Sequence, residues 1–132
     1  MKLINRDTDY ALRAMSFIVK YNKKIVSVAE LVKSLKIPRP FLRKILQKLN
    51  KRGILKSYKG KDGGFLLAKP ANKIFLVDLI EILQGPLRFN ECFFKKIICP
   101  NISACALRKK IERIERYIFL ELKSISLASL LK

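Results

Sequence analysis

Residues 27–67 read SVAELVKSLKIPRPFLRKILQKLNKRGILKSYKGKDGGFLL, and this stretch decides the fold. It opens with an S-x-x-E capping box, so a helix is expected to begin at Ser27, with Glu30 closing the box. Pro38 disfavours helical geometry at the residue before it, and this helix should therefore stop near Lys36. A second helix follows after a turn of about four residues, which is typical of a helix-turn-helix.

The second helix of the pair is expected to start with Pro40 at its first position, where the missing N–H of proline costs nothing. Gly53 supplies the residue type that commonly ends a helix. Apolar side chains recur between them at helical spacing and should face the core. These side chains are Phe41, Leu42, Ile45, Leu46 and Leu49.

The periodicity changes after the second helix. Residues 54–58 and 65–67 resemble short strands, and the glycine-rich residues 59–64 between them suit a tight hairpin. Further helices are expected over residues 7–19 and 77–83. The sequence therefore predicts a mainly α fold with a small β-hairpin wing, which is a winged helix-turn-helix.

A long amphipathic helix is predicted near the C-terminus. From Ala104 onward apolar residues step by three or four, and the stripe is Leu107, Ile111, Ile114, Ile118 and Leu122. We interpret it as a dimerisation helix, because so long and narrow a stripe exceeds what a small domain covers by itself. The alternative is a helix packed back on its own domain.

These elements divide the chain into three predicted parts. Residues 1–86 form the winged helix-turn-helix, residues 87–106 a cysteine-containing loop, and residues 103–132 the dimerisation helix and tail. No apolar run approaches the roughly 18 residues of a membrane span, and the N-terminus does not resemble a signal peptide.

The amino-acid composition narrows the classes of function that this protein can have. The chain has 132 residues with 29 Lys+Arg against 10 Asp+Glu, a net charge of +19, which indicates a polyanionic partner. The absence of histidine excludes Ser-His-Asp catalysis and His-ligated zinc. Three cysteines cannot all pair within one chain, so a reduced cytosolic compartment is expected. We find no nucleophile–base pair, P-loop or Rossmann glycines, and predict that the protein is not an enzyme.

Every charge from Lys33 to Lys61 is positive. The predicted DNA-contacting residues are Arg39, Arg43, Lys44, Gln47, Lys48 and Lys51 on the second helix and Lys59 and Lys61 on the wing. Arg43 and Gln47 are types that pair with base edges in the major groove, whereas lysines meet phosphates. The alternative of a solvated helix face normally mixes both signs of charge.

An RNA-binding or ribosome-associated basic protein is a second hypothesis of another class. RNA recognition uses exposed aromatic side chains that stack on bases. Phe41 and Phe65 are expected on core faces, which leaves Tyr58 as the candidate. Duplex DNA is therefore the favoured partner.

The three cysteines, Cys92, Cys99 and Cys105, lie within fourteen residues and could hold a soft metal. Neighbouring basic residues favour thiolates. Structural zinc is a competitor, although it usually needs four Cys or His ligands and shorter spacing. Buried hydrophobic thiols and a thiol redox pair are the remaining alternatives.

Four segments occur in an order and at separations that resemble a known family. They are residues 10–15 (YALRAM), 28–31 (VAEL), 41–49 (FLRKILQKL) and 63–68 (GGFLLA). The chain is similar over nearly its whole length to the bacterial winged-helix iron–sulphur-cluster transcription regulators typified by IscR and NsrR. The resemblance implies a homodimeric regulator, most simply a repressor, that binds a palindromic operator in double-stranded DNA.

The resemblance also implies an iron–sulphur cluster, of the 2Fe-2S or 4Fe-4S type, sensing nitric oxide, iron or redox status. Its ligands would be Cys92, Cys99 and Cys105, with Asp9 of the partner chain as the fourth. IscR-type clusters take a histidine three residues after the last cysteine, and Arg108 stands there in this chain. A cluster-free, thiol-sensing regulator is the alternative. For Asp9, the competing role is stabilisation of the helix N-terminus, with Asp7 or Thr8 as possible caps.

Overall fold

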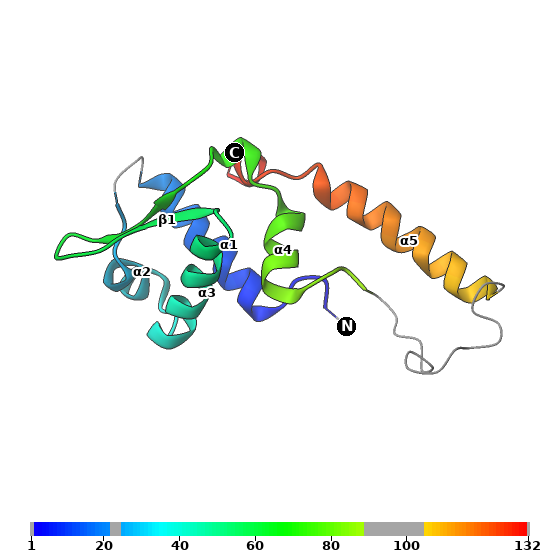
Figure 1. Ribbon diagram of the computed structural model, residues 1–132, viewed down its shortest axis with the longest axis horizontal. Coiled ribbons are helices and arrows are strands. Elements are labelled where there is room, and N and C mark those ends of the chain that lie inside the picture. The colour runs from blue at the N-terminus through cyan, green and yellow to red at the C-terminus, as the bar shows by residue number, and fades with distance from the viewer. Residues whose placement is uncertain (1, 22–24, 89–104, 132) are drawn as a thin grey trace.

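The computed structural model describes residues 2–21, 25–88 and 105–131. Within them the architecture is mainly helical with one two-stranded antiparallel hairpin, which confirms the predicted fold class (Figure 1). The elements are α1 (Arg6–Lys20), α2 (Val28–Leu35), α3 (Arg39–Lys51), β1 (Leu55–Tyr58), β2 (Gly64–Leu67), the 3-10 helix η1 (Ala71–Lys73), α4 (Leu76–Gln84), α5 (Ala106–Lys123) and α6 (Leu127–Leu130).

The helix-turn-helix forms where the sequence places it. Ser27 caps α2, its side chain accepting from the Glu30 N–H at 3.1 Å while a Glu30 carboxylate oxygen accepts from the Ser27 N–H at 3.3 Å. Lys36 ends the helix in the left-handed conformation, with φ 56°. The expected start of α3 was one residue late, because Arg39 is already helical and Pro40 occupies the second position. Proline fits there equally well, since first-turn N–H groups have no partner within the helix.

The main core lies between α1, α2, α3, β1 and α4. Leu42, Ile45, Leu46 and Leu49 of α3 are buried there, as their spacing predicts. Phe41 departs from the prediction, because 41% of this residue remains exposed. It lies at the border of the buried stripe of α3 rather than at its centre.

The wing is the hairpin of β1 and β2, in which Leu55 pairs with Leu67 and Tyr58 with Gly64. Val26 extends the pairing beside β2: its N–H donates to Phe65 O at 3.0 Å and its carbonyl accepts from Phe65 N–H at 2.8 Å. A methyl group at Gly64 would overlap the Val26 carbonyl oxygen. Glycine is therefore required by the close approach of two backbones.

The C-terminal helix packs differently along its length. Its last turns lie against α4, where Leu122 is 6% exposed in a small core with Val77 and Ile80. Leu122, which the sequence places in the dimer stripe, is thus buried by its own chain. Leu107 and Ile114 lie further toward the start of α5 and remain 63% and 49% exposed.

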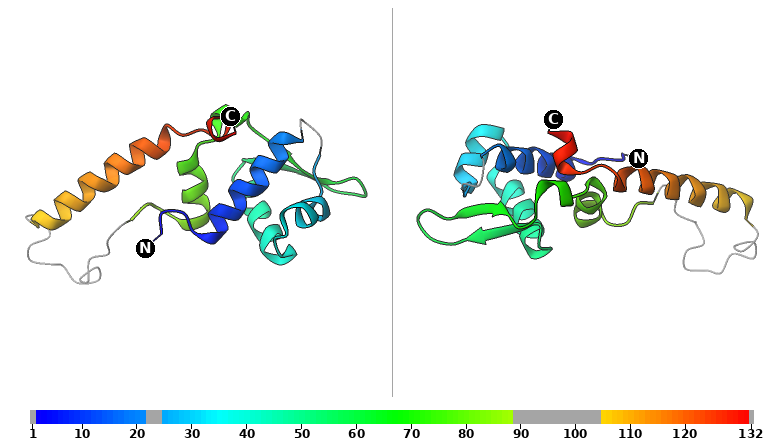
Figure 2. Two further views of the ribbon diagram at one scale, coloured as in Figure 1. Left: turned by 180° about the vertical axis from the view of Figure 1, so that it is seen from behind. Right: turned by 90° about the horizontal axis from the view of Figure 1, so that it is seen from above.

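The chain then returns to the winged-helix domain through α6. Leu127 is buried in the main core, and its N–H donates to the Ile74 carbonyl at 2.7 Å. Neither α6 nor η1 was predicted from the sequence. In the views of Figures 1 and 2 the wing and the start of α5 project in opposite directions from the central helices.

Candidate nucleic-acid interface

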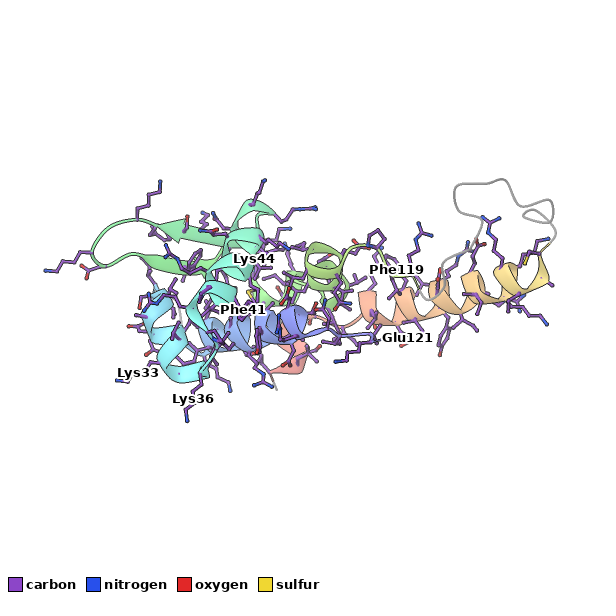
Figure 3. All side chains as sticks on the ribbon, turned by 90° about the horizontal axis from the view of Figure 1, so that it is seen from below. Lys33, Lys36, Phe41, Lys44, Phe119 and Glu121 are labelled. Carbon is purple, nitrogen blue, oxygen red and sulfur yellow. The ribbon has the colours of Figure 1, made fainter. Side chains whose placement is uncertain are left out.

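The outer face of α3 is polar and strongly basic. Its buried residues fall on one side, and the predicted contact residues fall on the other: Arg39, Arg43, Lys44, Gln47 and Lys51 are exposed, and Lys48 is partly exposed. Pro40 helps to start this helix directly after the turn, which leaves its first residues at the surface. Figure 3 shows Lys33 and Lys36 reaching outward from α2 and its C-terminal turn.

Nothing acidic neutralises this face within the part of the chain that the structure describes. There, no basic side chain from Lys33 to Lys61 has a carboxylate oxygen within 4.0 Å. Like charges held this close repel one another until a polyanion or counterions screen them. The face therefore has the electrostatic character of a phosphate-binding surface.

The wing adds cations beyond the end of α3. Lys59 and Lys61 are both exposed in the turn between β1 and β2, on either side of Gly60, which has φ 109°. Gly63 N–H donates to the Gly60 carbonyl at 3.1 Å and closes the turn. Asp62 is exposed at the same tip, so the wing presents a mixed but mainly basic end.

A contact that the sequence does not predict joins α1 to α3, the second helix of the helix-turn-helix, here called the recognition helix. The Arg6 guanidinium carbon lies 4.7 Å from the centroid of the Phe41 ring, and Phe41 lies on α3 next to α1 (Figure 3). The sequence does not predict this contact, because Arg6 lies outside the acid-free stretch and the spacing of Phe41 places it on the core face. The position of Phe41 at the edge of the apolar stripe was the available signal.

The start of α1 is anchored to the end of α4. Asn5 caps the helix by accepting from the Thr8 N–H at 2.9 Å, so the cap is neither Asp7 nor Thr8. The Thr8 hydroxyl, on a fully buried residue, donates to Gln84 Oε1 at 2.6 Å, and Asn5 N–H donates to the same oxygen at 2.9 Å. This network fixes the first turn of α1 against the body of the domain.

The predicted cluster ligands are described only in part. Cys92 and Cys99 lie outside the described residues. Cys105 is a free, partly buried cysteine at the N-cap of α5, and Asp9 Oδ2 is ion-paired with Arg13 at 3.1 Å. Across the described residues no group of three or more Cys, Asp or Glu side chains is arranged to hold a metal ion.

Only two of the five residues of the predicted dimer stripe are exposed in the part of the chain that the structure describes. Leu107 and Ile114 are exposed, Ile111 and Ile118 are partly buried, and Leu122 is buried against α4. Outside the stripe, Leu120 and Tyr117, which lies next to Ile114 around the helix, are exposed as well. In the first half of α5, Leu107 and Ile114 are thus left largely exposed by the part of the chain that the structure describes. None of the helices described is long and apolar enough to cross a membrane.

A helix-turn-helix with a basic outer face, followed by a basic hairpin, defines a winged-helix transcription regulator that binds DNA. The chain belongs to the Rrf2 family, described as iron-dependent transcriptional regulators, whose model matches residues 4–132. Its role is therefore regulatory rather than enzymatic.

Two curated relatives show how far the similarity extends. The chain is 36% identical over 111 residues to an HTH-type transcriptional regulator of Aquifex aeolicus, covering 83% of this chain and 77% of that protein. It is 30% identical over 131 residues to the HTH-type transcriptional regulator NsrR of Oceanobacillus iheyensis, covering 98% and 89%.

Two solved structures share the fold. IscR of T. potens superimposes with a TM-score of 0.75 at 25% identity, over 99% of this chain and 86% of that one. CymR of B. subtilis, described as the global cysteine regulator of that bacterium, superimposes with a TM-score of 0.79 at 24% identity, over 99% of this chain and 97% of that one. At this identity the likeness to CymR concerns the fold alone.

Proposed function

We propose that the protein is a homodimeric repressor that binds a palindromic operator in duplex DNA. The observation that carries this proposal is the acid-free outer face of α3 beside the basic wing. Arg43 and Gln47 read base edges in the major groove, while Lys44, Lys48 and Lys59 bind phosphates. Dimerisation through α5 places two recognition helices about 34 Å apart, one turn of DNA.

The test is selection of duplexes from a pool with a random central region, followed by competition. The protein should enrich a palindromic sequence and bind it far more tightly than an unrelated duplex in the same salt. Single-stranded DNA and RNA of the same sequence should compete poorly. Enrichment of no sequence, or stronger binding to the RNA, would overturn the proposal and favour the RNA-binding alternative.

We propose further that binding is gated by an iron–sulphur cluster held by Cys92, Cys99 and Cys105, with Asp9 of the partner chain as the fourth ligand. Thiolates are the usual ligands of such clusters, and a carboxylate can complete the set where no histidine exists. Cys105 fits this role as a free, partly buried cysteine at the start of α5. When bound, the cluster supplies iron–sulphur bonds that respond to nitric oxide, iron supply or redox state.

The arrangement of α1 and α5 supports a ligand from the second chain. Figures 1 and 2 show the first turn of α5 well separated from α1 of the same chain. Asp9 lies one turn before Arg13, whose guanidinium holds the Asp9 carboxylate at 3.1 Å in this chain. Asp9 lies on the first turn of α1, which hydrogen bonds hold in place, and α1 packs against α3. A cluster bound by Asp9 would therefore be connected to α3 through α1.

Anaerobic purification with iron and sulphide assays and an absorption spectrum tests the gating. Cys99→Ala should abolish the cluster, whereas Asp9→Ala should retain a cluster with an altered spectrum or stability. Asp7→Ala is the matched control and should leave the spectrum unchanged. A parent protein without iron, whose DNA binding follows thiol oxidation instead, would replace this proposal with the thiol-sensing alternative. An Asp9→Ala spectrum equal to that of the parent would exclude Asp9.

A further inference from the structure

Arg6 lies in the first turn of α1, outside both the helix-turn-helix and the wing, yet it contacts the recognition helix. Its guanidinium stacks over the Phe41 ring at 4.7 Å from the centroid. The contact is open to solvent, because the Arg6 side chain is 62% exposed and Phe41 is 41% exposed. Stacking of this kind uses one face of the planar guanidinium and leaves the N–H donors in its plane available.

The contact lies on one flank of α3. Phe41 precedes Lys48 by seven residues, about two helical turns, and therefore shares its side of the helix. Arg43, two residues after Phe41, lies about 200° away around the helix axis. A recognition helix in the major groove has a phosphate backbone along each flank. Arg6 is thus on the Lys48 flank, beside a backbone rather than above base edges.

Nearby carboxylates leave the charge of Arg6 largely free. Asp7 Oδ1 lies 3.9 Å from Arg6 Nε, the long limit for an ion pair, and both side chains are partly exposed. Such a pair contributes little in water. Asp9, the other acid of the first turn, is instead paired with Arg13 at 3.1 Å.

Hydrogen bonds hold the first turn of α1, which carries Arg6, against the rest of the domain. Asn5 and Thr8, on either side of it in sequence, both donate to Gln84 Oε1, at 2.9 Å and 2.6 Å, and Gln84 Nε2 donates to the Leu3 carbonyl at 3.2 Å. A helix end held in this way does not fray, so the guanidinium is oriented before a ligand arrives. Preorganised side chains lose less entropy on binding.

We propose that Arg6, oriented by Phe41, is a third DNA-contacting element that binds a backbone phosphate on the Lys48 flank of the recognition helix. Phe41 acts as its positioning residue. The inference rests on the proposed function, since it presumes that α3 enters the major groove. It adds a contact from α1 that neither the helix-turn-helix nor the wing provides.

The test is the dependence of duplex affinity on KCl concentration for Arg6→Gln and Lys20→Gln. Both variants remove one positive charge from α1, but Lys20 is exposed at the opposite end of this helix. Loss of a phosphate contact should weaken binding to the selected and the unrelated duplex alike and reduce the salt slope by about 1. Lys20→Gln should change the slope little.

Variants of Phe41 test the positioning role. Phe41→Leu should weaken binding in the parent but have little further effect in Arg6→Gln, whereas Phe41→Tyr keeps the ring and should retain the parent's slope. Equal slopes for Arg6→Gln and Lys20→Gln, with a parent that still prefers its selected duplex, would overturn this inference alone. A parent with no preference for duplex DNA would instead overturn the proposed function.

Discussion

Gln84 uses one side-chain oxygen to accept from two groups of the N-terminal segment, the Asn5 N–H and the Thr8 hydroxyl. Thr8 is the fully buried polar residue among those the structure describes, and its hydroxyl has this partner within the domain. Burial makes such a bond costly to lose, since the orphaned donor keeps its desolvation penalty. The two hydrogen bonds to Gln84 therefore fix the position of α1 against α4.

Replacing Gln84 with leucine should lower the free energy of unfolding by about 1–3 kcal/mol, because the Thr8 hydroxyl and the Asn5 N–H would lose their acceptor. Urea denaturation measures the change. Gln47→Leu, on the exposed face of α3, is the matched control and should shift stability by much less. Equal effects of the two substitutions would contradict the role assigned to Gln84.

Arg43 and Lys48 lie on different sides of α3 and should act differently on DNA. Arg43→Ala should relax specificity, with a good base contact worth about 1–3 kcal/mol. Lys48→Ala should weaken the selected and the unrelated duplex alike and flatten the salt slope. Titrations of both duplexes at several salt concentrations measure this. If each substitution reduced the two affinities equally, the assignment of Arg43 to base edges would be wrong.

At the scale of elements, the wing depends on a close backbone approach. Gly64 lies where any Cβ would overlap the Val26 carbonyl, so β2 and the strand-like Val26 approach this closely only with glycine. Gly60 in the loop serves a different purpose, because it adopts a positive φ of 109° at the turn. Gly64 thus allows the wing to pack against Val26, and Gly60 allows the hairpin to turn.

Gly64→Ala should displace β2 from Val26 and cost about 1–3 kcal/mol of stability, as overpacking usually does. Because the wing then carries Lys59 and Lys61 away from their positions, affinity for all duplexes should fall as well. Ser57→Ala is the control, since Ser57 is exposed opposite Phe65 in the same hairpin. Thermal unfolding and duplex titration test both effects, and a Gly64→Ala protein with parent-like values would refute the packing argument.

At the scale of the whole molecule, α5 packs on its own domain at one end and exposes apolar side chains at the other. Its last turns pack on α4 through Leu122, while Leu107 and Ile114 nearer its start remain exposed. Apolar side chains that the described part of the chain leaves exposed suit an interface between two copies of the chain. Assembly and DNA affinity are coupled in such a dimer, because the interface sets the distance between the recognition helices.

Ile114→Lys should place a charge in this interface and yield monomers with much weaker operator binding. Leu120→Lys makes a similar change at an exposed position about 120° away around α5 and should leave the dimer intact. Sedimentation gives the oligomeric state of each variant. An intact dimer in Ile114→Lys, or monomers in Leu120→Lys alone, would place the interface on another face.

The sequence by itself determined the elements whose signals are local. The Ser27–Glu30 capping box, Pro38 and the glycines of the hairpin act through bonds and sterics within a few residues, so α2, the turn and the wing were predicted from them. Hydrophobic periodicity likewise predicted which residues of α3 face the core, with Phe41 as the exception at the border of the stripe.

Only the tertiary structure decided which surfaces meet. The sequence places Leu122 in an apolar stripe, but α4 covers it in the structure. The sequence places Leu127 in the C-terminal tail, but it packs in the main core with Ile74. The pairing of Thr8 with Gln84 joins residues 76 positions apart, which no local pattern encodes. Burial and hydrogen bonding of this kind depend on the relative placement of whole helices, and that placement is set by the summed packing of the core rather than by any one segment.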